Sequence, residues 1–104
     1  MREPTTQPRY YVVFFDIDYP SVGAALADAP ESLAAHKKRV QEWHEQGQLV
    51  MAGAFGDTPD GRLQTMGVLT SREAAADFAQ GDPFVVKGKV IRWSIREWNN
   101  MLVS

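Results

Sequence analysis

The chain has no cysteine among its 104 residues. A disulfide framework, a thiolate nucleophile and a thiolate metal site are therefore all excluded. Its 13 acidic and 11 basic residues give a formal net charge of −2, so it lacks the excess of Lys and Arg that is typical of a nucleic-acid-binding domain. No apolar run approaches the roughly 18 residues of a membrane span. We therefore expect neither nucleic acid nor a membrane among its partners.

The N-terminal segment MREPTTQPR (residues 1–9) has no apolar core of the kind that a secretory signal peptide carries. Its side chains are mostly polar and it contains two prolines, so we expect residues 1–9 to form a flexible tail. Residues 10–104 then have the length of a single domain. We expect the protein to be cytoplasmic.

Residues 10–104 show clear changes of hydrophobic pattern. The segment YYVVFFD at 10–16 is short and rich in aromatic and β-branched residues, which favours a strand. From about residue 31 to residue 46 the pattern is helical, because apolar positions recur at three- and four-residue spacing and so share one face. The stripe on that face consists of Leu33, His36, Val40 and Trp43.

Further strands are expected at 49–55, 63–70 and 90–98, and a second long helix, capped by Ser71, at 72–81. A short helical turn is expected ahead of the first long helix, around AALADA. The order of the elements is β-α-β-β-α-β, which predicts a ferredoxin-like α+β fold.

The expected first strand also predicts a homodimer. In the split βαβ arrangement two helices cover one face of a four-stranded sheet, but YYVVFFD is apolar at consecutive positions, so both of its faces need cover. An uncovered apolar patch of that size is unusual on a monomer. We therefore expect two copies of the chain to meet with their sheets face to face.

His36 is a candidate for chemistry because it lies in the apolar stripe, where an imidazole needs a hydrogen-bond partner. Both helices lie on the same face of the sheet, so the segment QGDPFVVKG at 80–88 can return close to the first helix. We predict a hydrogen bond between His36 and Asp82 of that segment. Such a carboxylate fixes the tautomer of the imidazole and raises its basicity.

Asp82 also has an interpretation without chemistry. An Asp before a Pro at the start of a helix is a common cap, in which the carboxylate accepts bonds from free N–H groups. DPFVVKG would then be a short capped turn that ends at Gly88. The KKR run at 37–39 is likewise interpreted most simply as a solvated helix face.

Two stretches, HKKRVQEWHEQGQLVMAGAF at 36–55 and GDPFVVKG at 81–88, resemble the YCII-related family of small proteins. The resemblance extends from the first strand to the last. It is carried by a helix His, a second His with a Gly, an Ala-Gly pair in the next strand, and an Asp-Pro-aromatic run with a following Gly. These residues are His36, His44, Gly47, Ala52, Gly53, Asp82, Pro83, Phe84 and Gly88.

The resemblance implies a dimeric α+β-barrel fold with His36 and Asp82 as an active-site pair. Members often carry an Arg three residues before the helix His, where this chain has Leu33. Arg39, three residues after His36, is the candidate for substrate binding in its place, with its side chain directed either to the cavity or to water.

Two further residues are expected at the substrate site. Phe84 is a pocket candidate because it is two residues from Asp82. Gly53 either lets a ligand or a backbone approach the sheet closely or marks a β-bulge.

No metal and no cofactor are expected. His36 and His44, the only histidines, are eight residues apart in one helix, which is too far to chelate one ion. The chemistry that fits is proton abstraction from a small organic substrate, in an isomerase- or lyase-type reaction that includes dehalogenation, with His36 as base and Asp82 orienting it. Two alternatives stay open: a cofactor-free monooxygenase-like enzyme, and a non-catalytic dimeric module that binds a small ligand or regulates.

Overall fold

A computed structural model describes residues 9–102 of the chain. Its elements, in order, are β1 (Arg9–Ile17), α1 (Val22–Asp28), α2 (Pro30–Glu45), β2 (Leu49–Ala54), β3 (Leu63–Leu69), α3 (Arg72–Gly81), α4 (Pro83–Val86) and β4 (Val90–Asn99). The strands and the two long helices follow the predicted β-α-β-β-α-β order, and the ferredoxin-like α+β fold is confirmed. No helix within residues 9–102 is both long and apolar enough to cross a membrane.

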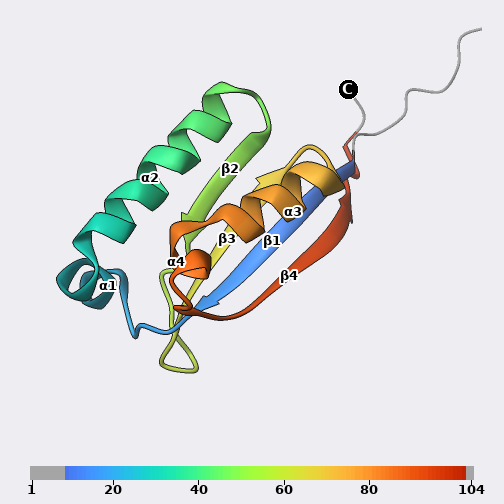
Figure 1. Cartoon of the computed structure of the whole chain (residues 1–104). Helices are drawn as coiled ribbons and strands as arrows, with labels where there is room; N and C mark the ends of the chain where they lie inside the picture. The colour runs from blue at the N-terminus through green and yellow to red at the C-terminus, as the bar shows by residue number, and fades with distance from the viewer. Residues whose placement is uncertain (1–8, 103–104) are drawn as a thin grey trace, which may run out of the picture.

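The four strands form one sheet in the order β2-β3-β1-β4, and each neighbouring pair is antiparallel. The two long helices lie on one face of this sheet (Figure 1). Helix α3 packs over β1, β3 and β4, whereas α2 packs against β2 at the sheet edge. The segment that joins α3 to β4 contains α4, which contacts α2. Residues on α2 and at the end of α3 are thereby brought together.

The core lies between α3 and the sheet. Alternate side chains of β1 point toward the helices, and Val13, Phe15 and Ile17 are buried there. The ring of Phe15 lies 6.2 Å from that of Phe78 on α3, centroid to centroid. The small buried side chains of Ala74, Ala75 and Ala79 let α3 approach the sheet closely.

The bounds of the strands and of the two long helices lie within one residue of the expected ones, and the main differences concern the N-terminal segment and the first short helix. Strand β1 begins at Arg9, which pairs with Asn99 of β4, so the expected tail is one residue too long. Residues 1–8 and 103–104 lie outside the described part of the chain. The expected helical turn is a full helix, α1, and α2 follows it almost directly. The break falls at Ala29 because the residue before Pro30 is disfavoured in helical conformation.

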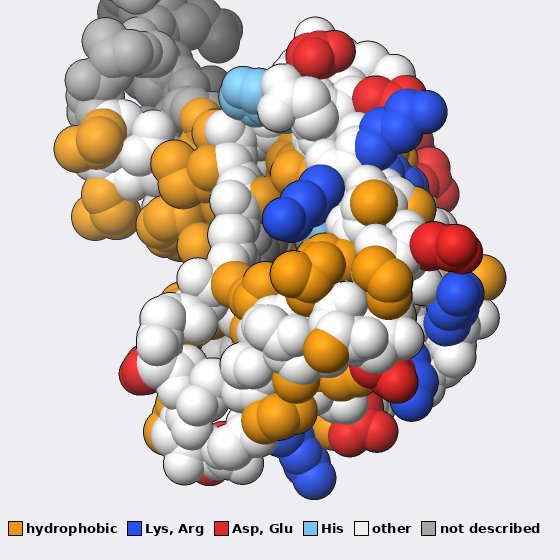
Figure 2. Space-filling view, turned by 90° about the vertical axis from the view of Figure 1, so that its left-hand side faces the viewer, with side chains coloured by type: hydrophobic (Ala, Val, Ile, Leu, Met, Phe, Trp, Pro, Cys, Tyr) orange, Lys and Arg blue, Asp and Glu red, His pale blue; other side chains and the backbone are white. Residues whose placement is uncertain are grey.

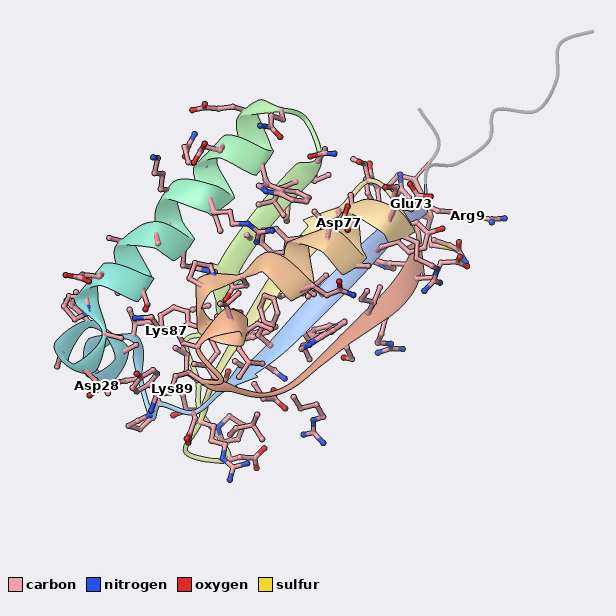
Figure 3. The ribbon with its side chains drawn as sticks, viewed as in Figure 1. Arg9, Asp28, Glu73, Asp77, Lys87 and Lys89 are labelled. Carbon is pink, nitrogen blue, oxygen red and sulfur yellow. The ribbon has the colours of Figure 1, made fainter. Side chains whose placement is uncertain are left out.

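Polar contacts at one end of the molecule hold α1 in place. The hydroxyl of Tyr19 donates to Oδ2 of Asp28 at 2.6 Å, and the ammonium of Lys89 lies 5.6 Å from the Tyr19 ring centroid. Asp28, Lys87 and Lys89 gather at this end (Figure 3), where they line one shallow hollow with Tyr19. These contacts join three segments, which are the loop after β1, helix α1, and the chain that follows α4.

The face of the sheet that turns away from the helices is covered by no helix within residues 9–102. It carries Val12 and Phe14 of β1, and Trp98 of β4, which is 52% exposed. Asp16 lies on the same face and accepts two bonds from the guanidinium of Arg92, at 2.9 and 3.1 Å. This guanidinium holds the pKa of the Asp16 carboxyl below its usual value. We call this surface the open face.

Candidate active site

Asp82 lies at the junction of α3 and α4, where its extended backbone ends one helix and begins the next. Its Oδ2 accepts a hydrogen bond from the backbone N–H of Phe84 at 3.0 Å, and Pro83 occupies the first position of α4. Asp-Pro is therefore an N-cap, as the sequence indicates. Gly88 then ends the turn with a φ of +73°, a conformation that other residues rarely adopt.

The other oxygen of the same carboxylate contacts His36. Nδ1 of His36, on α2, lies 2.5 Å from Oδ1 of Asp82, so the predicted hydrogen bond is present. The Asp82 side chain is 2% exposed and that of His36 is 18% exposed. The cap and the histidine contact do not compete, because each uses its own oxygen. Asp82 therefore serves α4 and His36 at the same time.

This contact determines which ring nitrogen of His36 is free. A carboxylate oxygen only accepts, so Nδ1 is the nitrogen that carries the proton in the neutral ring. Nε2 is then left with its lone pair. Within residues 9–102 no protein group forms a hydrogen bond with Nε2. The ring of Phe84 lies 5.8 Å from that of His36 and packs beside it.

His36 lines a cavity of about 360 Å³ between the sheet and the helices. Most of the lining side chains are apolar, among them Phe15, Phe78 and Phe84. The view onto the side of the molecule that carries α1 and α2 (Figure 2) shows a hollow surrounded by hydrophobic side chains, with a Lys or Arg side chain at its edge. An apolar cavity with few polar groups is typical of a site for a small organic molecule.

Gly53 and Phe84, both expected at the substrate site, line this cavity. A Cβ atom added to Gly53 would meet no other atom within 4 Å, so packing does not require a glycine there. The β-bulge considered for Gly53 lies elsewhere, between Leu49 and Met51. The small side chains of Ala52 and Ala54 flank Gly53, and together this stretch of β2 leaves the cavity wide.

Arg39 is not among the residues that line the cavity, and its partly exposed side chain binds α3. Its Nη1 donates to the backbone carbonyl of Phe78 at 2.8 Å, and its Nη2 donates to that of Asp77 at 3.0 Å. Both carbonyls belong to α3, on which Asp77 is labelled in Figure 3. The guanidinium also lies 4.9 Å from the ring centroid of Trp43. Carbonyls toward a helix C-terminus attract a cation, which explains the contact.

Arg39 therefore fastens α2 to the end of α3 that carries Asp82. A Cβ atom added to Gly81 would lie only 2.5 Å from Nη2 of Arg39. We expect Gly81→Ala to displace this guanidinium and to lower the free energy of unfolding by about 1–2 kcal/mol, despite the better helix propensity of Ala. Urea unfolding measures the effect. Gly53→Ala is the matched control, since its added Cβ meets nothing, and equal stability of the two variants would contradict the expectation.

The sequence analysis did not predict three polar residues of the cavity lining, which are Lys37, Gln41 and Thr65. Lys37, for which a solvated helix face is predicted, is exposed but also lines the cavity. Its spacing of four residues from Gln41 places the two on one stripe of α2, next to the stripe of His36. Thr65 alternates with Leu63 and Gly67 on the helix-facing side of β3, which is the pattern that could have revealed it.

His44 has a structural role in the turn between α2 and β2. A carbonyl oxygen only accepts, so Nδ1 of His44 donates to the backbone oxygen of Leu49, at 2.8 Å. Gly47 makes this turn with a φ of +80°. In the part of the chain from residue 9 to residue 102, no three His, Asp or Glu side chains gather in a way that could hold a metal ion.

Comparisons with known proteins agree with this fold. The family model of the YCII-related domain matches residues 19–99, which is most of the chain. The chain is similar to the solved structure of a 5-chloro-2-hydroxyhydroquinone dehydrochlorinase from Burkholderia phenoliruptrix AC1100, in complex with 2,5-dihydroxybenzoquinone. That match has a TM-score of 0.60 and 16% identity, and covers 86% of this chain and 92% of that one.

It is also similar to a NIPSNAP family protein from Agrobacterium tumefaciens str. C58, with a TM-score of 0.54 and 11% identity over 100% of this chain and 95% of that one. No curated protein matches the chain. At these identities the solved structures show a shared fold, that of the dimeric α+β-barrel proteins. The family match and the fold together establish that this chain belongs to the YCII-related domain family.

Proposed function

We propose that this protein is a small cofactor-independent enzyme in which His36 abstracts a proton from a small organic substrate. The observation that carries the proposal is the contact between Nδ1 of His36 and Oδ1 of Asp82 at 2.5 Å, beside a mostly apolar cavity. Because Asp82 occupies Nδ1, the lone pair of Nε2 is the one available to a molecule in the cavity. Asp82 orients the ring and stabilises the imidazolium that forms.

The reaction balances without a redox partner. Nε2 takes a proton from a C–H bond of the substrate, and the electron pair of that bond becomes part of a new double bond. In an elimination, a leaving group such as a halide departs with its own bonding pair, and the imidazolium later releases its proton to water. In an isomerisation, the imidazolium returns the proton to a different carbon.

Elimination is favoured by one fold relative. The dehydrochlorinase that shares this fold removes the elements of hydrogen chloride, as its name states. Its likeness to this chain concerns the fold alone at 16% identity, so the reaction class rests on the His36 site. In that site the small side chains of Ala52 and Ala54, on either side of Gly53, leave space for the substrate, and Phe84 forms a wall beside the imidazole.

Two other functions predict different behaviour. A cofactor-free monooxygenase would consume oxygen in step with an electron-rich aromatic substrate. A binding or regulatory module would hold a ligand in the same cavity without turnover, and the His36–Asp82 pair would then be structural. The capping role of Asp82 is compatible with that second alternative, so only an activity measurement separates them.

The test is proton exchange and halide release in D2O. Wild-type protein is incubated with small aryl ketones that can enolise and with chlorinated hydroquinones. Deuterium incorporation is followed by NMR, chloride release by ion chromatography, and oxygen uptake by electrode. We expect catalysis of at least one probe by the wild type and its loss in His36→Asn. Equal rates for both proteins on every probe would leave the non-catalytic module as the function, whereas oxygen uptake would support the monooxygenase.

We also propose that the protein is a homodimer that packs through the open face. That face presents a hollow lined by Val12, Phe14, Met66, Arg96, Glu97 and Trp98, of which Trp98 is 52% exposed. A stable interface buries on the order of 1,200 Å² in total, and an apolar sheet face can supply this area. We expect equilibrium sedimentation to give the mass of a dimer at micromolar concentration.

The substitution Trp98→Lys should shift the protein toward monomer, because it places a charge on an apolar residue of the proposed contact. Leu26→Lys is the matched control, since Leu26 is 54% exposed against 52% for Trp98 but lies on α1. A wild-type monomer at micromolar concentration would contradict the proposal, as would a dimer that both variants preserve.

A further inference from the structure

The lining of the His36 cavity is unbalanced in charge. Lys37 is the only Lys or Arg among the residues that line it, and none of them is Asp or Glu. Asp82 lies behind the His36 ring, where it is 1% exposed and does not line the cavity. A molecule in the cavity therefore meets one full positive charge and no negative one.

Lys37 is also free to use that charge on a ligand. The ion pairs formed within residues 9–102 are His36–Asp82 and Asp16–Arg92, and neither involves Lys37. Lys37 is exposed and also lines the cavity, so this residue lies where the cavity meets solvent. It follows His36 directly on α2, and Gln41, one turn further along, lines the cavity with it.

The arrangement suits a particular kind of ligand. The deeper wall of the cavity is apolar, with three phenylalanines and the small side chains of β2, so it favours an apolar body. Attraction between opposite charges is stronger beside such a wall than in open water, because the effective dielectric constant is lower. An anionic oxygen at one end of the ligand would meet Lys37, and the apolar body would extend toward His36 and Phe84.

We propose that the substrate of this cavity is a small organic anion with an apolar body, a carboxylate or a phenolate, and that Lys37 is the residue that selects it. The proposal rests on the proposed function only in that the substrate occupies this cavity. Once a proton has been taken from such a substrate, its negative charge increases, and the ammonium of Lys37 also stabilises the anion that forms.

The experiment compares two probes of the same shape and different charge. Sodium benzoate and benzamide are titrated separately into the wild-type protein at equal ionic strength and neutral pH, and the ring signals of His36 report binding by NMR. The variants are Lys37→Met and the control Lys38→Met, because Lys38 is the neighbouring exposed lysine and does not line the cavity. Both substitutions remove one charge from the same helix.

We expect benzoate to bind about tenfold more tightly than benzamide in the wild type and in Lys38→Met, and about equally in Lys37→Met. Equal binding of both probes by the wild type overturns the proposal. An equal loss of the preference for benzoate in Lys37→Met and Lys38→Met also overturns it. The same holds if neither probe shifts the ring signals of His36. The readout needs no turnover, so selective binding of benzoate combined with unchanged rates in His36→Asn would refute the proposed function while this inference stands.

Discussion

His36→Asn is expected to lower the rate of proton abstraction by roughly 10²–10⁴-fold, the usual contribution of a positioned general base. The substitution is chosen for its geometry. The amide nitrogen of Asn sits close to where Nδ1 of His36 lies and can still donate to Oδ1 of Asp82. Asn has no atom at the position of Nε2. The hydrogen bond is therefore kept while the proposed base is removed.

Because the bond to Asp82 is kept, the free energy of unfolding should fall by less than about 1 kcal/mol, mainly from the lower helix propensity of Asn. Steady-state kinetics on the most active probe measure the change in rate, and urea unfolding of the same samples measures the change in the free energy of unfolding. An unchanged rate would show that the base is not His36. A large loss of stability would show that the imidazole is needed for packing beside Phe84. The lower rate would then not be attributable to the loss of a base.

Asp82→Ala and Asp82→Asn are expected to separate the two tasks of Asp82. Alanine removes the cap on Phe84 N–H and leaves the buried Nδ1–H of His36 without an acceptor. These losses together should lower the free energy of unfolding by about 2–4 kcal/mol. Asparagine caps a helix about as well as aspartate, so Asp82→Asn should cost less than about 1 kcal/mol.

Asp82→Asn should nevertheless lower the rate of proton abstraction by roughly 10²–10⁴-fold, because an amide in this place can donate as well as accept and no longer fixes the imidazole tautomer. Unfolding curves and rates for the two variants provide the check. If Asp82→Asn kept the wild-type rate, Asp82 would be a cap and nothing more. If it unfolded as easily as Asp82→Ala, the charge of Asp82 would serve stability rather than His36.

The order of the elements and the contact of His36 with Asp82 could be predicted from sequence because both depend on topology. With both long helices on one face of the sheet, the segment after α3 can run beside α2, as α4 does, and Asp-Pro determines the direction of the carboxylate. The limits of α2, Pro30 and Glu45, lie within one residue of the expected 31–46, and Gly47 lies just beyond its end.

The directions of the charged residues on α2 could not be predicted in the same way. Lys37 and Arg39 belong to one basic run, and the helical pattern alone cannot say which neighbour covers each of them. Arg39 binds carbonyls of α3 because α3 ends beside it, which depends on how the two helices pack. Lys37 borders the cavity because the wall on β2 consists of small side chains, so a space remains between α2 and the sheet.

The central claim is that Asp82 leaves Nε2 of His36 as the free, unprotonated nitrogen. The most direct test is the ¹⁵N spectrum of the His36 ring in wild type and in Asp82→Asn, recorded at a pH at which the ring is neutral. We predict that the wild type shows a protonated Nδ1 and an unprotonated Nε2, and that Asp82→Asn shows a mixture of the two tautomers. A protonated Nε2 in the wild type, or identical spectra for the two proteins, would contradict the account.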